Sequence, residues 1–244
     1  MQLIPAIDLL DGRVVRLLQG DFEQCKVYDE NALQLAGTYH EAGADWLHIV
    51  DLAASRDGEK ADCSALFSLL GSAGQSVQTG GGVRNEDDVL RRLNQGAQRV
   101  VVGSLCVAEP HRFARWLGEF GSDRLVAALD VQRGCDGIWW PRIHGWTEAG
   151  KRGLFDLLDE LTTRGLRHVL CTDISRDGAL SGPNLDLYNG IIARYPQIEL
   201  QASGGVSSLA DLRQLKLTCA SGAITGKALL EGRFTIAEAL QVIE

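Results

Sequence analysis

The sequence predicts an α/β fold, a (β/α)8 TIM barrel built from two half-barrel repeats, and three observations support it. The length of 244 residues is usual for one such barrel. Short apolar runs alternate with amphipathic stretches along the chain, as buried strands alternate with helices. Similar segments also return after half of the chain. We expect one barrel domain over residues 1–244, with half-repeats at about 1–122 and 123–244.

The apolar runs supply the eight strands that a closed barrel needs. They are residues 2–7, 46–50, 76–79, 99–102, 125–129, 168–172, 198–203 and 222–225. Most are nearly continuous in apolar residues, which is typical of parallel strands buried on both faces. Their even spacing, with a helical stretch after the last one, favours closure over an open doubly wound sheet.

The segments between the strands carry helix-start signals. Asn85 precedes three acidic residues at 86–88, and such a cap and charge pattern complements the positive end of a helix dipole. The stretch after residue 206 has the same arrangement with a Ser cap, and residues 235–244 are expected to close the eighth unit as a helix. These signals predict a helix after most strands.

Four features recur at half the chain length. The pairs are Asp8 with Asp130 and Asp51 with Asp173, both 122 residues apart, and Gly81–Gly82 with Gly204–Gly205 and Gly103 with Gly226, both 123 residues apart. The phrase Ser-Arg-Asp-Gly also occurs twice, at 55–58 and 175–178, but 120 residues apart. We interpret the two phrases as one half-barrel loop that has drifted.

Composition and charge narrow the class of protein. The net charge of −8 argues against a nucleic-acid or anionic-membrane surface. The six cysteines are widely scattered without a Cys-x-x-Cys pair, so we expect reduced thiols and no metal site. The first residues lack a basic region followed by a long apolar run, so we expect neither a signal peptide nor a membrane span there. These features predict a cytoplasmic protein.

Glycine-rich turns after four strands predict two phosphate sites at the mouth of the barrel. In this fold the loops after the strands meet at one face, where substrates bind. Backbone N–H groups at the starts of helices suit a phosphate dianion, and a Cβ would keep the backbone from its oxygens. The residues are Gly81, Gly82, Arg84, Gly103 and Ser104 in the first half, and Ser203, Gly204, Gly205, Gly226 and Lys227 in the second. Two matched sites predict a long ligand with a phosphate at each end.

Asp8 and Asp130 are expected at the ends of the first and fifth strands, on opposite sides of an eight-stranded barrel. Two carboxylates facing each other across a substrate can divide acid and base roles when their environments separate their pKa values. Arg16 and Arg84 are candidate cations for the substrate or its phosphates. His48 and His168 lie in apolar strands, so we expect packed, hydrogen-bonded core histidines.

The motifs together resemble the ProFAR isomerases of histidine biosynthesis over essentially the whole chain. They are "IPAIDLLDGRVVRLLQGD", "VQTGGGVRNEDDVLRRL", "LCTDISRDGALSGPN", "ASGGV" and "TGKALLEGRFT". The resemblance implies an Amadori rearrangement, without metal or organic cofactor, of N′-((5′-phosphoribosyl)formimino)-5-aminoimidazole-4-carboxamide ribonucleotide (ProFAR). It also implies a monomer that needs no protein partner.

The resemblance further assigns roles to single residues. It implies that Asp8 is the base that removes the C2′ proton and that Asp130 is the acid that helps to open the ribose ring. It implies that Thr172 and Asp177 line the site and order the loop after the sixth strand, and that Trp146 packs on the substrate. The sequence departs from the family at Lys227, where many members have Arg, and in lacking a proline at the start of the helix near residue 31.

Three alternatives stay open. The cyclase subunit of imidazole glycerol phosphate synthase shares the fold and the paired acids, but it opens on a Lys-rich strand that this chain lacks and needs a glutaminase partner. An isomerase acting also on phosphoribosylanthranilate is a second alternative. A barrel that only binds a phosphorylated metabolite is the third, and the presence of both acids argues against it.

Overall fold

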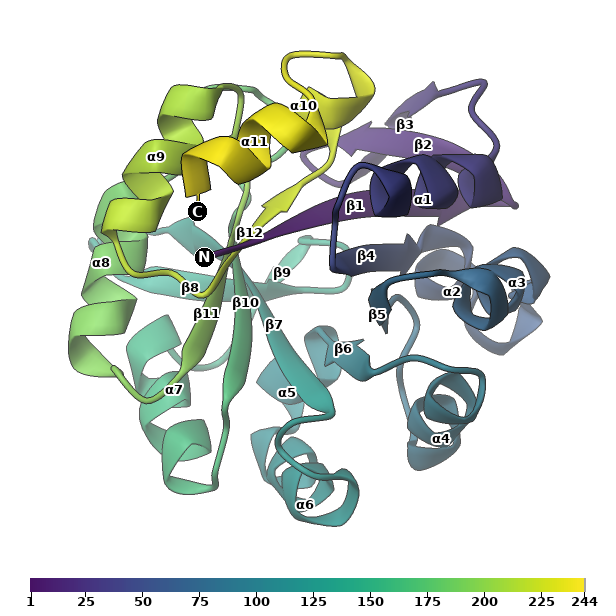
Figure 1. The fold of residues 1–244 in the computed structure, drawn as a ribbon. Helices are drawn as coiled ribbons and strands as arrows, with labels where there is room; N and C mark the ends of the chain where they lie inside the picture. Colours follow the sequence, from purple (N-terminus) through teal and green to yellow (C-terminus); the bar gives the residue numbers. More distant parts are fainter. Residues whose placement is uncertain (244) are drawn as a thin grey trace.

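Eight parallel strands close into a barrel in the computed structural model, which describes residues 1–243 (Figure 1). In barrel order they are β1 (Gln2–Leu10), β4 (Trp46–Asp51), β5 (Ser76–Gly80), β6 (Arg99–Val102), β7 (Leu125–Arg133), β10 (His168–Asp173), β11 (Glu199–Ser203) and β12 (Gly222–Thr225). Each pairs in parallel with the next, and the pairing of β12 with β1 closes the ring. The predicted barrel and its eight strands are confirmed.

Helices surround the strands (Figure 1). They are α1 (Ala32–Glu41), α2 (Leu52–Asp57), the short 3-10 helix η1 (Gly58–Lys60), α3 (Ser64–Ser72), α4 (Glu86–Asn94), α5 (Ser104–Ala108), α6 (Pro110–Phe120), α7 (Leu154–Thr163), α8 (Leu185–Arg194), α9 (Leu209–Leu217), α10 (Lys227–Leu230) and α11 (Ile236–Ile243). Asn85 and Ser208 form capping boxes at the starts of α4 and α9, as their sequences predict. Among the described residues, no helix is long and apolar enough to cross a membrane.

Two hairpins extend the first and fifth barrel strands beyond the expected ends. In the first, β2 (Arg13–Leu18) pairs antiparallel with β1 and with β3 (Asp21–Val27). In the second, β8 (Trp139–Ile143) pairs antiparallel with β7 and with β9 (Glu148–Ala149). The expectation that Asp8 and Asp130 end their strands was therefore wrong, because β1 and β7 continue past these residues as partners of β2 and β8.

The core has two layers. The larger one lies between the strands and the helices, where Trp116, Phe113 and Tyr188 are among the largest fully buried side chains. The smaller one fills the barrel interior and consists of Ile4, Ala6, Val101, Val126, Leu170 and Ile224. Successive residues of each strand alternate between these two layers, because their side chains point to opposite faces of the sheet. The inner layer forms an apolar floor below the mouth of the barrel.

Candidate active site

A cavity of about 590 Å³ occupies the mouth of the barrel, and residues from both halves of the chain line it. A volume of this size suits a small organic ligand. The predicted site residues that line it are Asp8, Arg16, Gly81, Gly82, Arg84, Gly103, Ser104, Asp130, Trp146, Thr172, Asp177 and Ser203. The remaining four, Gly204, Gly205, Gly226 and Lys227, line a smaller adjoining pocket of about 20 Å³. The structure thus brings all the predicted site residues to one face.

Asp8 is paired with a buried guanidinium. Arg16 Nη1 donates to Asp8 Oδ2 over 2.6 Å, and Arg16 Nη2 donates to Asp177 Oδ1 over 3.1 Å. The antiparallel pairing of β1 with β2 brings Arg16 close to Asp8, because the residue before Arg16, Val15, is the cross-strand partner of Asp8. Burial raises the pKa of Asp8, and the Arg16 charge opposes that rise without cancelling it. The cation therefore favours an ionised carboxylate within an apolar site.

Asp130 has neutral hydrogen-bond donors. Trp146 Nε1 donates to Asp130 Oδ2 over 2.8 Å, from a backbone in the left-handed region (φ 70°). Burial raises the pKa of Asp130, while hydrogen bonds from Trp146 and Thr172 lower it by less. Thr172 lies directly opposite Asp130 in the pairing of β10 with β7. A partly buried carboxyl with a raised pKa and no adjacent cation is better suited to holding a proton than an exposed one.

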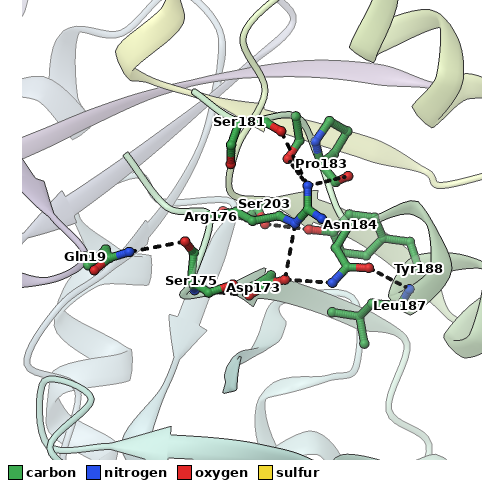
Figure 2. Close-up of polar contacts among 11 residues, drawn as sticks. Gln19, Asp173, Ser175, Arg176, Ser181, Pro183, Asn184, Leu187, Tyr188 and Ser203 are labelled. Carbon is green, nitrogen blue, oxygen red and sulfur yellow. Dashed lines mark hydrogen bonds and ion pairs between the residues drawn. The ribbon is translucent and has the colours of Figure 1, made fainter. Parts of the chain in front are cut away.

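The loop after β10 is organised around the buried carboxylate of Asp173, as Figure 2 shows. Asp173 Oδ1 accepts hydrogen bonds from the backbone N–H of Ser175 over 3.0 Å and from its hydroxyl over 2.6 Å. Asp173 Oδ2 accepts from Asn184 Nδ2 over 2.7 Å, and Arg176 Nε lies 3.6 Å away. Arg176 Nη1 in turn donates to the carbonyl of Gly182 over 2.8 Å. This network fixes both ends of the loop that carries Asp177 to the cavity.

The two Ser-Arg-Asp-Gly phrases have different structures. The first begins in α2, where Arg56 pairs with its neighbour Asp57 at the surface. The second forms turns after β10, and its Asp177 lies on the cavity wall. Only the second copy therefore supplies its aspartate to the cavity lining.

The glycine pairs of the two halves are required mainly by packing. Gly81 and Gly82 have positive φ values of 99° and 68°, and a Cβ on either would overlap the backbone of Asp51 or Ala54. In the second half a Cβ on Gly204 would lie 2.9 Å from the carbonyl oxygen of Asp173. The expected reason, approach to a phosphate, was thus incomplete, because Gly81 and Gly204 are in close contact with the ends of the neighbouring strands β4 and β10, at Asp51 and Asp173.

Gly103 differs from those pairs. Its φ is −93°, and an added Cβ would meet no described heavy atom within 4 Å. The backbone there is at the start of α5 and borders the main cavity. Its neighbour Ser104 accepts, at Oγ, a hydrogen bond from the backbone N–H of His144 over 3.1 Å. Space for a ligand is therefore left at Gly103 itself, and Ser104 connects this turn to the β8–β9 hairpin.

The smaller pocket is nearly closed by the loop after β10. Lys227 Nζ donates to the carbonyl oxygen of Gly178 over 2.6 Å, and the Arg16 guanidinium packs against Gly226. Its 20 Å³ are room for about one water molecule. A phosphate could enter only if Gly178 and its neighbours moved away from Lys227. In the first half, Arg84 Nη2 donates to the carbonyl oxygen of Ser55 over 3.1 Å and borders the open cavity.

Of the two strand histidines, His48 is buried and hydrogen-bonded as expected, whereas His168 departs from that expectation. His48 is buried but lines the main cavity, and its Nδ1 lies 3.2 Å from Gln78 Nε2. Burial lowers the pKa of His48 to about 3, so its ring is neutral. His168 is buried with no hydrogen-bond partner on either ring nitrogen among the described residues, and its pKa is lowered to about 4, chiefly by burial.

Sequence reasoning placed Trp146 at the site but missed the rest of the β8–β9 hairpin that carries it. Arg142 on β8 donates from Nε and Nη2 to the carbonyl oxygen of Trp146, over 3.1 and 2.9 Å, and lines the cavity with His144. The run "WWPRIHGW" at 139–146 was the available signal, since polar residues alternate there with large apolar ones. Across residues 1–243, no group of three or more His, Cys, Asp or Glu side chains is arranged to hold a metal ion.

Comparisons with known proteins place the sequence among histidine biosynthesis proteins. The family described as "Histidine biosynthesis protein" matches residues 2–235. The chain is similar to proteins named 1-(5-phosphoribosyl)-5-((5-phosphoribosylamino)methylideneamino)imidazole-4-carboxamide isomerase. That of Maricaulis maris is 50% identical over 240 residues, which are 98% of each chain. That of Psychromonas ingrahamii is 46% identical over 98% of this chain and 97% of its own. That of Xanthomonas axonopodis pv. citri is 47% identical over 97% of each.

Proposed function

The chain belongs to the histidine biosynthesis protein family, and from this membership we propose that it isomerises ProFAR to its phosphoribulosyl form. ProFAR is the compound in the names of the relatives, and it carries a phosphoribosyl group at each end. The reaction is an aldose-to-ketose rearrangement of an aminosugar. The two glycine-rich ends of the mouth, with Arg84 in one half and Lys227 in the other, are the proposed phosphate sites.

One observation carries the mechanism: a buried carboxyl group, Asp8, and a partly buried one, Asp130, share the cavity, but only Asp8 has a cation beside it. A cation favours the ionised form, and burial with neutral donors favours the protonated form. Asp8 is therefore the proposed base and Asp130 the proposed acid. Asp130 gives a proton to the ring oxygen as the C1′–O bond breaks and C1′ becomes doubly bonded to nitrogen. Asp8 then takes the C2′ proton, leaving an enolamine that tautomerises to the ketose.

The remaining predicted residues have supporting roles in this proposal. Arg16 favours the ionised form of Asp8 and contacts Asp177 of the loop after β10. Thr172 donates to Asp130, and Trp146 covers the same carboxylate. Ser203 borders both pockets, between the acids and the second phosphate site. No metal or organic cofactor enters any step, since proton transfers alone complete the rearrangement.

The proposal is tested by giving the purified protein ProFAR and, in parallel, phosphoribosylanthranilate. We expect turnover of ProFAR. Turnover of both would favour the dual-substrate isomerase. A third reaction, with the phosphoribulosyl isomer and ammonia, tests the cyclase alternative, and activity there alone would replace the proposal. Activity in none of the three would favour a barrel that only binds a phosphorylated metabolite.

We also propose that the protein acts in the cytoplasm as a monomer without a partner subunit. The motif resemblance supports this part of the proposal. Light scattering during size-exclusion chromatography should give a mass near 26.4 kDa. A mass of twice that value across a range of concentrations would contradict it.

A further inference from the structure

The β2–β3 hairpin reaches over the cavity with a two-residue turn. The turn residues Gln19 and Gly20 have φ values of 50° and 75° and connect the paired residues Leu18 and Asp21. Two consecutive positive φ values are the mark of a type I′ hairpin turn, which tolerates glycine best at its second position. The positive φ of this turn position is therefore by itself a sufficient reason for a glycine at residue 20.

A second requirement falls on Gly20 from outside the hairpin. A Cβ on Gly20 would lie 2.7 Å from Cε3, 2.9 Å from Cζ3 and 3.0 Å from Cδ2 of Trp146. These are aromatic carbons of the same indole, so the ring lies against the Gly20 backbone and has no room for a methyl group. This contact connects the turn of the β2–β3 hairpin to the turn of the β8–β9 hairpin.

Trp146 is held at three points. Its indole Nε1 donates to Asp130 over 2.8 Å, its backbone carbonyl oxygen accepts from Arg142, and its ring lies against Gly20. Arg142 fixes the backbone of Trp146, whereas Gly20 is the contact that limits where the ring itself can lie. A ring pushed away from Gly20 would carry Nε1 away from Asp130.

The turn at Gln19 and Gly20 also contacts the loop after β10. Gln19 Nε2 donates to the carbonyl oxygen of Ser175 over 3.1 Å, as seen at the left of Figure 2. Ser175 belongs to the network around Asp173 that shapes the loop carrying Asp177. One turn therefore contacts the loops that flank both Asp130 and Asp177.

We propose that Gly20 is a positioning residue, whose lack of a side chain seats the Trp146 indole so that Nε1 donates to Asp130. The residue touches no reacting atom and acts only through the indole. The inference rests on the proposed function for its effect on turnover, but the seating of the ring is a property of the ligand-free protein. The two parts are therefore separately measurable.

The chain contains a matched control for this proposal. Asp11 and Gly12, in the turn between β1 and β2, have φ values of 51° and 77°, nearly equal to those of Gln19 and Gly20. A Cβ on Gly12 would meet Ala65 Cβ at an ordinary 3.9 Å. Gly12→Ala thus measures the backbone cost of alanine in such a turn, and Gly20→Ala measures that cost plus the collision with the indole.

The first readout is the indole N–H resonance of Trp146, assigned by its loss in Trp146→Phe. We expect Gly20→Ala to move it as far as Asp130→Asn does, and Gly12→Ala to leave it unchanged. This spectrum needs no activity, so it stands even if ProFAR is not turned over. An unmoved resonance in folded Gly20→Ala would overturn the proposal.

The second readout is turnover in a double-mutant cycle. Gly20→Ala should lower kcat about tenfold, with a smaller change in KM, as expected when the hydrogen bond that orients the proposed acid Asp130 is lost. In a Trp146→Ala background, where the collision is gone, the same change should alter kcat less than about twofold. If Gly20→Ala alone does not fold, the double variant Gly20→Ala/Trp146→Ala should still fold. Its stability should equal that of the control Gly12→Ala/Trp146→Ala. An equal effect of Gly20→Ala in both backgrounds, or a double variant that also fails to fold, would overturn the proposal.

Discussion

Gln78 and Gln201 exchange two hydrogen bonds inside the barrel. Gln78 Nε2 donates to Gln201 Oε1 over 2.6 Å, and Gln201 Nε2 donates to Gln78 Oε1 over 2.9 Å. Both side chains are buried, and the residues are 123 apart, the same offset as the glycine turns that follow them. Two positions separated by the half-chain offset therefore meet inside the barrel, and His48, which contacts Gln78, connects the pair to the cavity.

The Gln pair should be strongly coupled in stability. Gln78→Leu leaves the amide of Gln201 buried without its partner, which should lower the free energy of unfolding by about 1–3 kcal/mol. Replacing both residues by Leu should cost less than the sum of the two single changes, because no unsatisfied amide is left. Urea unfolding of the four proteins measures this coupling. Additive losses would show that the two amides contribute independently.

Gly82 and Gly103 should respond oppositely to alanine. At Gly82, a Cβ overlaps the Ala54 backbone and φ is 68°, so Gly82→Ala should cost at least about 2 kcal/mol of stability. At Gly103 the Cβ enters open space, so Gly103→Ala should leave the melting temperature unchanged and raise KM for ProFAR. Thermal unfolding and steady-state kinetics separate the two effects. A destabilised Gly103→Ala or a stable Gly82→Ala would contradict this division.

Removing Arg16 should move the acidic limb of the pH profile upward. Burial raises the pKa of Asp8 and the Arg16 cation opposes that rise, so Arg16→Met should raise it further. Asp8 is needed in its ionised form, and a higher pKa means that activity appears only at higher pH. Arg16→Lys, which keeps a charge, should give a smaller shift. The pH dependence of kcat/KM measures both. An unmoved or lowered limb in Arg16→Met would contradict the proposed role of the ion pair.

The fold was predictable because the barrel strands are locally encoded. Their continuous apolar runs depend only on burial, and the helix caps at Asn85 and Ser208 depend only on adjacent residues. The β2–β3 and β8–β9 hairpins were missed because their residues mix exposed and buried positions, as in the largely exposed β3. The full length of β1 and β7 was missed for the same reason, because their last residues pair with β2 and β8 of these hairpins.

The membership of the site was more predictable than its contacts. The half-chain repeat found the acids and glycine turns, since every (βα) unit directs its strand end to the same mouth. The pairing of Arg16 with Asp8 depends on the register of β2, and the donor to Asp130 depends on the left-handed backbone of Trp146. Neither follows from residue type or spacing. The small second pocket depends on where Gly178 lies against Lys227, which sequence does not specify.

The turnover of ProFAR by Asp8→Asn beside the unchanged protein tests the central claim most directly. The amide cannot take the C2′ proton, so kcat should fall by at least about a thousandfold, within the range for loss of a general base. Binding of ProFAR, measured by calorimetry, should persist because both phosphate sites are intact. Near-normal turnover in a correctly folded Asp8→Asn would contradict the account.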